Sequence, residues 1–244
     1  MKKIGQILTV MVALCCLSAC ETIPDVHCFC QCGFDSREEI EFSFGASKVE
    51  LISDLEFVEG IDGRALRVKK GTLPLRVEFL HNLPESCGKI EYWARLENPG
   101  RNMPSQFLPL DITGWHVMNR ITTNTGAGSC GWQCSIAGYH LYQFQGCGSR
   151  PLSEVFGPHD PTSWHHYETR WNIDGLSSDP EKVVSFRIDG MEVLSATKAT
   201  LDRERFVKHL RSSRVLGIGG DTHSSCRSSV DFLIDNLKIW DVDK

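Results

Sequence analysis

Apolar and polar residues alternate with a period of two through most of the chain after residue 40. In residues 164–171, the side chains of Tyr167, Thr169 and Trp171 fall on one side and polar side chains fall between them. This alternation is typical of a β-strand with one buried face. Residues 183–193 alternate in the same way around Asp189-Gly190, a dipeptide that favours a tight hairpin turn because it tolerates positive φ angles. We therefore expect two strands and a turn here.

The remaining segments follow the same pattern. Alternation or short apolar runs predict strands at residues 40–44, 49–58, 64–68, 75–80, 89–96, 107–112, 115–121, 135–145, 214–219 and 230–240. A single short helix is expected at residues 202–209. Many short strands separated by turns, with almost no helical periodicity, predict an all-β protein: a two-sheet antiparallel β-sandwich.

The first residues have the composition of an export signal. Lys2 and Lys3 precede a mostly apolar stretch that is too short to span a bilayer. Leu17-Ser18-Ala19-Cys20 resembles the lipobox of bacterial lipoproteins, in which the cysteine becomes the acylated mature N-terminus. The resemblance implies a signal peptide at residues 1–19, lipidation of Cys20 and attachment to a lipid bilayer. Glu21 rather than Asp follows Cys20, which favours the outer membrane; an ordinary cleaved signal is the alternative.

Charge and cysteine content narrow the picture further. The formal net charge is −5 and basic residues do not cluster, so we expect no nucleic-acid partner. Eight cysteines lie beyond Cys20, and an even number in an exported chain predicts disulfides: Cys28, Cys30, Cys32, Cys87, Cys130, Cys134, Cys147 and Cys226. We expect residues 20–38 to be a tether that disulfides tie to the body. A metal site at the first three cysteines is one alternative, although their spacing differs from that of zinc ribbons. Free or mixed thiols are the other alternative.

Five segments in order resemble the laminin-G-like, concanavalin A-like jelly-roll family. They are Gly60 to Val68, the Trp93-bearing strand at 89–96, Trp164-His165-His166, Phe186 to Gly190, and 216–220 followed by 234–240. The resemblance implies a jelly-roll domain over residues 39–244. Members of this superfamily bind glycans, bind proteins or hydrolyse polysaccharides, and often hold one structural Ca2+. Asp235 is the weak calcium candidate; a hydrogen-bonded structural carboxylate is the alternative.

No arrangement of residues predicts catalysis. Jelly-roll glucanases carry paired carboxylates on one strand, and only Glu39 and Glu41 come near that pattern. We expect those two to lie on a solvated edge. We therefore expect no enzymatic activity and no certain cofactor.

Two groups of residues are candidates for ligand binding. His166, Glu168 and Arg170 share one strand face, with Arg187 expected on the neighbouring strand; a solvated face of cross-strand charge pairs is the alternative. Trp115, Trp132 and Tyr142 lie in a region that the resemblance does not cover, where loops carry function, or they pack beneath those loops.

The sequence thus predicts an exported, membrane-anchored lipoprotein whose sandwich binds a glycan or a protein partner. The first alternative is a jelly-roll enzyme that degrades polysaccharide. The second is a structural or adhesion protein of the cell envelope with no small ligand.

Overall fold

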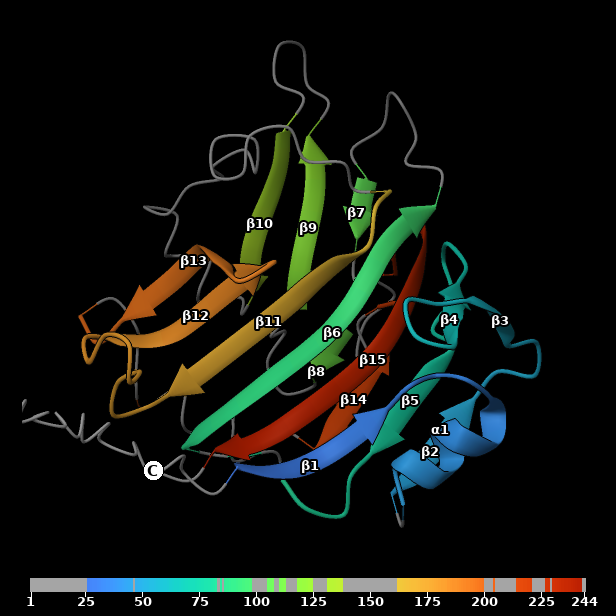
Figure 1. The fold of residues 1–244 in the computed structure, drawn as a ribbon, viewed down its shortest axis with the longest axis horizontal. Coiled ribbons are helices and arrows are strands. Elements are labelled where there is room, and N and C mark those ends of the chain that lie inside the picture. The colour runs from blue at the N-terminus through green and yellow to red at the C-terminus, as the bar shows by residue number, and fades with distance from the viewer. Residues whose placement is uncertain are drawn as a thin grey trace, which may run out of the picture.

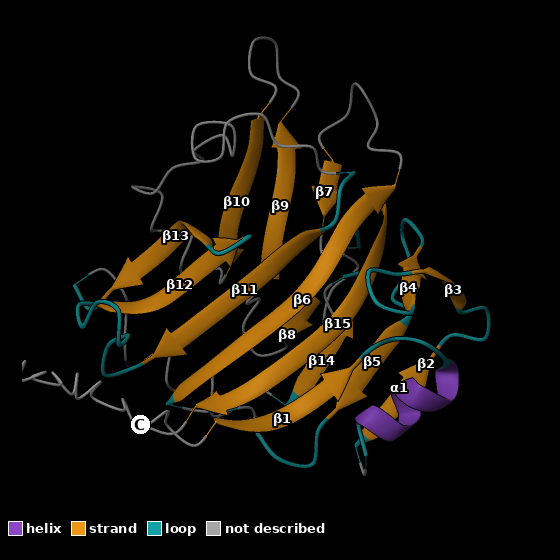
Figure 2. Cartoon of the chain, viewed as in Figure 1, coloured by secondary structure: helices purple, strands orange, loops and turns teal. Residues whose placement is uncertain are grey.

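The protein is a β-sandwich in which antiparallel sheets face each other across an apolar core (Figure 1). This computed structural model describes residues 26–45, 47–82, 84, 86–97, 105–107, 110–112, 118–124, 131–137, 162–199, 204, 214–220, 227–228 and 230–242. Strands account for nearly all regular structure in these residues, and one helix, α1, lies beside them (Figure 2). The predicted fold class is confirmed.

One layer is an eight-stranded sheet, here called the large sheet. Its order is β13-β12-β11-β6-β15-β4-β3, and β1 also pairs with β15. Its strands are β1 (Val26–Cys32), β3 (Glu56–Glu59), β4 (Arg64–Val68), β6 (Cys87–Glu97), β11 (His165–Asn172), β12 (Lys182–Ile188), β13 (Met191–Thr197) and β15 (Asp231–Val242). β6, β11 and β15 are the central strands of this layer.

The second layer lies behind the large sheet in Figure 1 and contains a four-stranded and a three-stranded sheet. The four-stranded order is β2-β5-β14-β8 and the three-stranded order is β10-β9-β7. The strands are β2 (Lys48–Leu51), β5 (Leu75–Glu78), β7 (Ser105–Phe107), β8 (Leu110–Ile112), β9 (Met118–Asn124), β10 (Gly131–Ala137) and β14 (Val215–Ile218).

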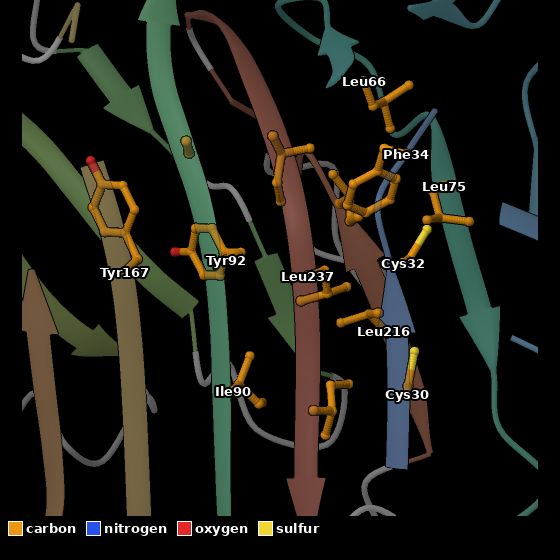
Figure 3. Close-up of a cluster of buried hydrophobic side chains, with 14 of the residues drawn as sticks. Cys30, Cys32, Phe34, Leu66, Leu75, Ile90, Tyr92, Tyr167, Leu216 and Leu237 are labelled. Atoms are coloured by element: carbon orange, nitrogen blue, oxygen red, sulfur yellow. The ribbon is translucent and has the colours of Figure 1, made fainter. Parts of the chain in front are cut away.

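The core forms where the inward faces of the two layers meet. Tyr92 and Tyr167 stack on each other from β6 and β11, with ring centroids 5.3 Å apart. Leu75 and Leu216 of the second layer belong to the same apolar cluster, and Cys32 lies among its side chains (Figure 3). Each fully buried large apolar side chain contributes about 1.5–3 kcal/mol. The residues that alternate inward along the strands therefore hold the layers together.

The predicted hairpin is confirmed. Asp189 and Gly190 connect β12 to β13 with φ angles of 50° and 78°, the conformation that a primed two-residue turn requires. The Asp189 carboxylate also accepts hydrogen bonds from the His166 backbone N–H at 2.9 Å and from His165 Nδ1 at 2.6 Å. The turn is thereby tied to the start of β11.

The strand predicted at residues 40–44 is wrong, because helix α1 (Arg37–Ser43) forms there. Ser36 caps the helix by accepting the backbone N–H of Glu39 at 3.1 Å. The Glu39 carboxylate turns back and accepts the backbone N–H groups of Gly33 and Asp35, each at 2.6 Å. Ser36 and Glu39 have the spacing of a capping box, the sequence signature of a helix start.

The tether predicted at residues 20–38 includes ordered structure. β1 runs antiparallel to the second half of β15, from Val26 opposite Val242 to Cys32 opposite Leu237. Cys30 and Cys32 are buried in the core. Residues 26–38 therefore belong to the sandwich, and residues 20–25 lie outside the described residues. The helix expected at residues 202–209 also lies outside them, apart from Glu204.

Gly88 on β6 offers a test of the packing between β6 and β11. The Trp171 ring lies directly over Gly88, and a Cβ atom there would overlap the ring. Trp171 cannot move easily, because it is buried and its Nε1 donates to the Pro84 carbonyl at 3.1 Å. We expect Gly88→Ala to destabilise the protein by about 1–3 kcal/mol, the usual cost of overpacking a core, as measured by urea unfolding.

Gly45→Asn is the control for this test. Gly45 has a φ angle of 56° and open space around its Cα, and asparagine tolerates that conformation. Equal stability of the two variants would contradict the packing assigned to Trp171.

Candidate functional site

The outward side of the central strands carries a continuous polar and aromatic surface, here called the outer face. Strict alternation along β6 buries every second residue and leaves the others partly exposed. Cross-strand pairing then sets each exposed residue beside two neighbours. The outer face contains Lys89, Glu91, Trp93 and Arg95 of β6, His166, Glu168 and Arg170 of β11, Arg187 of β12, and Lys238 and Trp240 of β15.

Glu91 is the most heavily contacted carboxylate of the outer face. Its Oε2 atom lies 3.0 Å from Lys89 Nζ and 3.4 Å from His166 Nε2, and its Oε1 accepts Trp240 Nε1 at 2.8 Å. Burial alone would raise the pKa of Glu91, but these hydrogen bonds outweigh burial and lower the pKa to about 2. Glu91 is therefore an ionised hub that joins β6, β11 and β15.

Three half-buried tryptophans lie on this side of the large sheet, each beside a polar group. The Trp93 ring is 5.2 Å from the His166 ring. Lys89 lies 5.1 Å above the Trp240 ring, and Arg95 lies 5.4 Å above the ring of Trp164, the residue before β11. Such cation–π contacts stabilise the side chains and fix the orientation of the rings. The outer face thus presents oriented aromatic surface next to hydrogen-bonding groups.

Two further carboxylates on this side of the large sheet, Glu168 and Glu192, form ion pairs. Arg170 binds both oxygens of the Glu168 carboxylate, at 2.7 and 2.8 Å. On β12 and β13, Glu192 accepts Lys182 Nζ at 2.6 Å and Ser185 Oγ at 2.9 Å. Arg187 stands between Glu168 and Glu192, and its buried Nε atom has no hydrogen-bond partner. Lys89, Arg95, Arg170, Arg187 and Lys238 stand against two carboxylates, Glu91 and Glu168, so the outer face carries more positive than negative charge.

The structure brings together one of the two predicted ligand groups. His166, Glu168, Arg170 and Arg187 lie on adjacent strands of the outer face, as expected. Trp115 and Tyr142 lie outside the described residues, and Trp132 is described only as a backbone position of β10 opposite Thr123. Sequence reasoning missed Trp93 and Trp240. The signal was present for Trp93, because it alternates with the predicted core residues Tyr92 and Ala94.

The three cysteines of β1 do not form the predicted disulfides. Cys28, Cys30 and Cys32 are free thiols. Burial raises the pKa of both core thiols, that of Cys32 to about 12, so neither ionises readily. A bulge between Cys28 and Cys30 places Cys28 on the outer face opposite Trp240, and Cys30 on the core face opposite Ile239. The three thiols therefore do not converge on a metal.

The structure places two of the other predicted cysteines in strands. Cys87 begins β6, opposite Asn172, and Cys134 is described only as a backbone position of β10 opposite Ile121. Cys130, Cys147 and Cys226 lie outside the described residues.

Asp235, the calcium candidate, does not lie on the core face, where its even spacing from Leu237 and Ile239 along one regular strand would place it. Asn236 has a φ angle of 51° and forms a bulge in β15, so Asp235 pairs with Trp93 while Leu237 enters the core. Loop 60–63 covers Asp235, whose Oδ2 accepts the backbone N–H of Ile61 at 2.9 Å and of Asp62 at 3.4 Å. Its Oδ1 atom is buried without a hydrogen-bond partner.

The surroundings of Asp235 do not fit a calcium ion well. Calcium takes six to eight oxygen ligands, whereas the contacts of Oδ2 are N–H donors. Nowhere in the described residues do three or more His, Cys, Asp or Glu side chains gather as metal ligands would. Burial raises the pKa of Asp235 to about 6, despite the N–H groups that favour its ionised form. A buried structural carboxylate accounts for these contacts.

The carboxylates considered for catalysis serve the helix instead. Glu39 accepts backbone N–H groups at the start of α1, and Glu41 lies 3.9 Å from Arg37 one turn away on its surface.

Among the described residues, no helix has the length and apolar character needed to cross a bilayer.

Comparisons with known proteins confirm the fold. No protein family and no curated protein sequence matches the chain. The carbohydrate esterase of Shiga toxin-encoding bacteriophage phi24B is 15% identical with a TM-score of 0.52, and the match covers 90% of this chain and 100% of the esterase. The botulinum neurotoxin serotype G binding domain is 10% identical with a TM-score of 0.53, covering 89% and 48% of the two chains.

A third solved structure shows a similarly low identity and similar coverage. The binding domain of Paraclostridial Mosquitocidal Protein 1 is 14% identical with a TM-score of 0.51, covering 88% of this chain and 49% of that chain. This protein therefore spans about half the length of the two toxin domains. At these identities the similarity shows a shared β-sandwich fold.

The hydrogen bonds of Glu91 predict a stability effect that depends on pH. The pKa of Glu91 is lower in the folded state than in the unfolded chain, so its stabilising effect is present above about pH 4.5 and disappears as the pH falls toward 2. We expect Glu91→Gln to reduce the free energy of unfolding by about 1–3 kcal/mol at pH 7 and by much less at pH 3. Urea unfolding at both pH values measures this.

Glu50→Gln is the matched control, because Glu50 lies at an exposed edge beside Lys48 and Arg76. Exposed ion pairs contribute little to stability. If Glu91→Gln lowered the free energy of unfolding equally at both pH values, the charge of Glu91 would not be the source of its stabilising effect.

The raised pKa of Asp235 predicts a stability that depends on pH in the opposite direction. Its pKa rises from 3.8 to about 6 on folding, so the folded state loses stability as the pH rises through this interval. We expect the stability of Asp235→Asn relative to the parent protein to increase between pH 4 and pH 7, by about 1–3 kcal/mol. Denaturant unfolding is to be measured in EDTA and in excess calcium chloride. Stabilisation by calcium in the parent but not in the variant would contradict the structural role and establish a calcium site.

Proposed function

We propose that this protein is an exported, lipid-anchored binding module whose outer face recognises a glycan or a protein partner. The observation that carries the proposal is a set of three half-buried tryptophans on this side of the large sheet: Trp93 beside His166, Trp164 beside Arg95 and Trp240 beside Glu91. An indole ring combines a flat apolar surface with an N–H donor, the combination found where proteins bind sugars and other proteins.

A glycan suits this surface best. Carbohydrate-binding surfaces combine ring faces with fixed hydrogen-bonding groups. Lys89 and Arg95 fix the orientation of the Trp240 and Trp164 rings, so these side chains would lose little conformational freedom on binding. The shared fold with a phage carbohydrate esterase and with toxin binding domains is compatible with this proposal.

The proposed lipid anchor is supported by the sequence alone. Leu17-Ser18-Ala19-Cys20 follows a basic start and an apolar stretch, and Glu21 favours the outer membrane. Two or three acyl chains on Cys20 would hold the protein at a bilayer almost permanently. The sandwich begins at Val26, only a few residues later.

The protonation states of the described carboxylates argue against glycoside hydrolysis. A general acid needs a raised pKa and access to the substrate. Glu91 has a lowered pKa, and Arg170 binds both oxygens of Glu168. Asp235 has a raised pKa but is buried beneath loop 60–63. We therefore propose binding rather than catalysis.

A glycan array tests the proposal with the parent protein and with Trp93→Ala and Trp164→Ala. We expect binding to at least one glycan class, weakened about 10-fold or more in both variants, because central aromatic contacts each contribute about 2 kcal/mol. Lys48→Ala on β2 is the control and should bind like the parent. Thermal unfolding identifies any variant that fails to fold.

Two outcomes would redirect the proposal. Release of reducing sugar from a polysaccharide panel would establish the enzyme alternative. Absence of glycan binding, together with capture of an envelope protein that both tryptophan variants lose, would identify a protein ligand.

A further inference from the structure

We infer that the end of the sandwich that carries Phe42 and Leu80 rests against the bilayer that holds the anchor, so that the opposite end points away from it. This inference depends on the proposed acylation of Cys20. It assigns a membrane-contact surface, here called the basal end, with Phe42 on α1 and Leu80 in the loop between β5 and β6.

The first argument is the length of chain between the acylated residue and the sandwich. Val26 begins β1 and is held in register opposite Val242. Five residues lie between Cys20 and Val26. These make six residue-to-residue steps, and an extended chain spans at most about 3.3–3.6 Å per step, or roughly 20 Å in all. The eleven residues of β6 extend roughly 36 Å at 3.3 Å per residue. The anchor therefore reaches one end of the large sheet.

The second argument is which elements share that end. Asp241 of β15 pairs with Gly88, so the start of β6 lies beside the end of β15 and the start of β1. These ends lie along the lower margin of Figure 1, where the chain also runs from β5 into β6. The Asp189-Gly190 turn pairs with the start of β11 at the other end of the sheet.

The third argument is the exposed apolar surface at the basal end. Phe42 is 85% exposed and Leu80 is 60% exposed, the two highest values among the large apolar side chains described. Phe44 lies two residues after Phe42, and Phe79 directly precedes Leu80. The Phe44 and Phe79 ring centroids are 6.1 Å apart, and the Phe79 ring lies 5.3 Å from that of Phe29 of β1. Phe42 and Leu80 therefore project from segments that pack together beside the anchored strand.

The charged residues near the basal end indicate whether its contact with the bilayer is electrostatic or apolar. Lys48 Nζ lies 2.7 Å from Glu50, and Arg214 lies 3.7 Å from Glu78. These cations are already paired, so attraction to anionic headgroups would be weak. Apolar side chains that enter the boundary between headgroups and acyl chains fit the surface better. We expect the contact to be insensitive to salt.

Hydrogen exchange monitored by mass spectrometry tests the orientation. The acylated full chain is placed in phosphatidylethanolamine–phosphatidylglycerol vesicles, and the Cys20→Ser chain is measured in solution. We expect slower exchange on vesicles in residues 37–45 and 79–82, at low and high salt alike. Residues 60–63 and 189–191, which carry the exposed Ile61 and Met191, should exchange equally in both samples.

Matched double variants separate apolar contact from mere proximity. We expect Phe42→Ser with Leu80→Ser to stay bound, because the acyl chains dominate membrane affinity, but to lose the protection of residues 37–45 and 79–82. Ile61→Ser with Met191→Ser should keep that protection.

Two results would overturn the inference, and they are distinguishable. An acylated, vesicle-bound chain with no protection at residues 79–82 overturns the membrane contact and leaves the anchor standing. An intact mass without acyl chains on Cys20 overturns both.

Discussion

The pairing of β15 with β6 is the constraint on which the rest of the structure depends. β15 runs beside β6 along nearly its whole length, while its other edge pairs first with β4 and then with β1. Because side chains alternate across a strand, the register of this pairing decides which residues reach the core and which reach the outer face. A slip of one residue would bury Trp240 and Lys238 and would expose Ile239. The Glu91 hub exists only in the observed register.

Two bulges adjust this register where a strictly regular strand would fail. The bulge at Asn236 lets Asp235 and Leu237, two positions apart, point to opposite faces. The carboxylate thereby meets the N–H groups of loop 60–63 instead of the core, where it would find no donors. The bulge between Cys28 and Cys30 does the same in β1, so that Cys30 packs in the core and Cys28 lies beside Trp240. Each bulge resolves a conflict between strand periodicity and the chemistry of one side chain.

These local features explain how far the sequence could predict the structure. Regular alternation was sufficient to predict which side chains of β6, β11 and β12 point into the core and which point outward, because burial of every second residue leaves a visible pattern. It was misleading at residues 40–44, where Ile40 and Phe44 also suit one side of a helix and the capping box at Ser36 and Glu39 decides the outcome. It was misleading again at Asp235, since a bulge leaves no period of its own. The contact between Glu91 and Trp240 joins residues 149 positions apart, which no local pattern reveals.

The ion pairs of the outer face limit what can bind to its carboxylates. Glu91, Glu168 and Glu192 each hold a cation already, so a cationic ligand would have to displace that partner and leave its charge unpaired. Breaking such a pair is costly, whereas adding a neutral group beside it is not. The tryptophan rings and the imidazole of His166 require no such exchange. A hydroxyl-rich ligand can bind beside these pairs without breaking them, which is why we propose a glycan rather than a cationic partner.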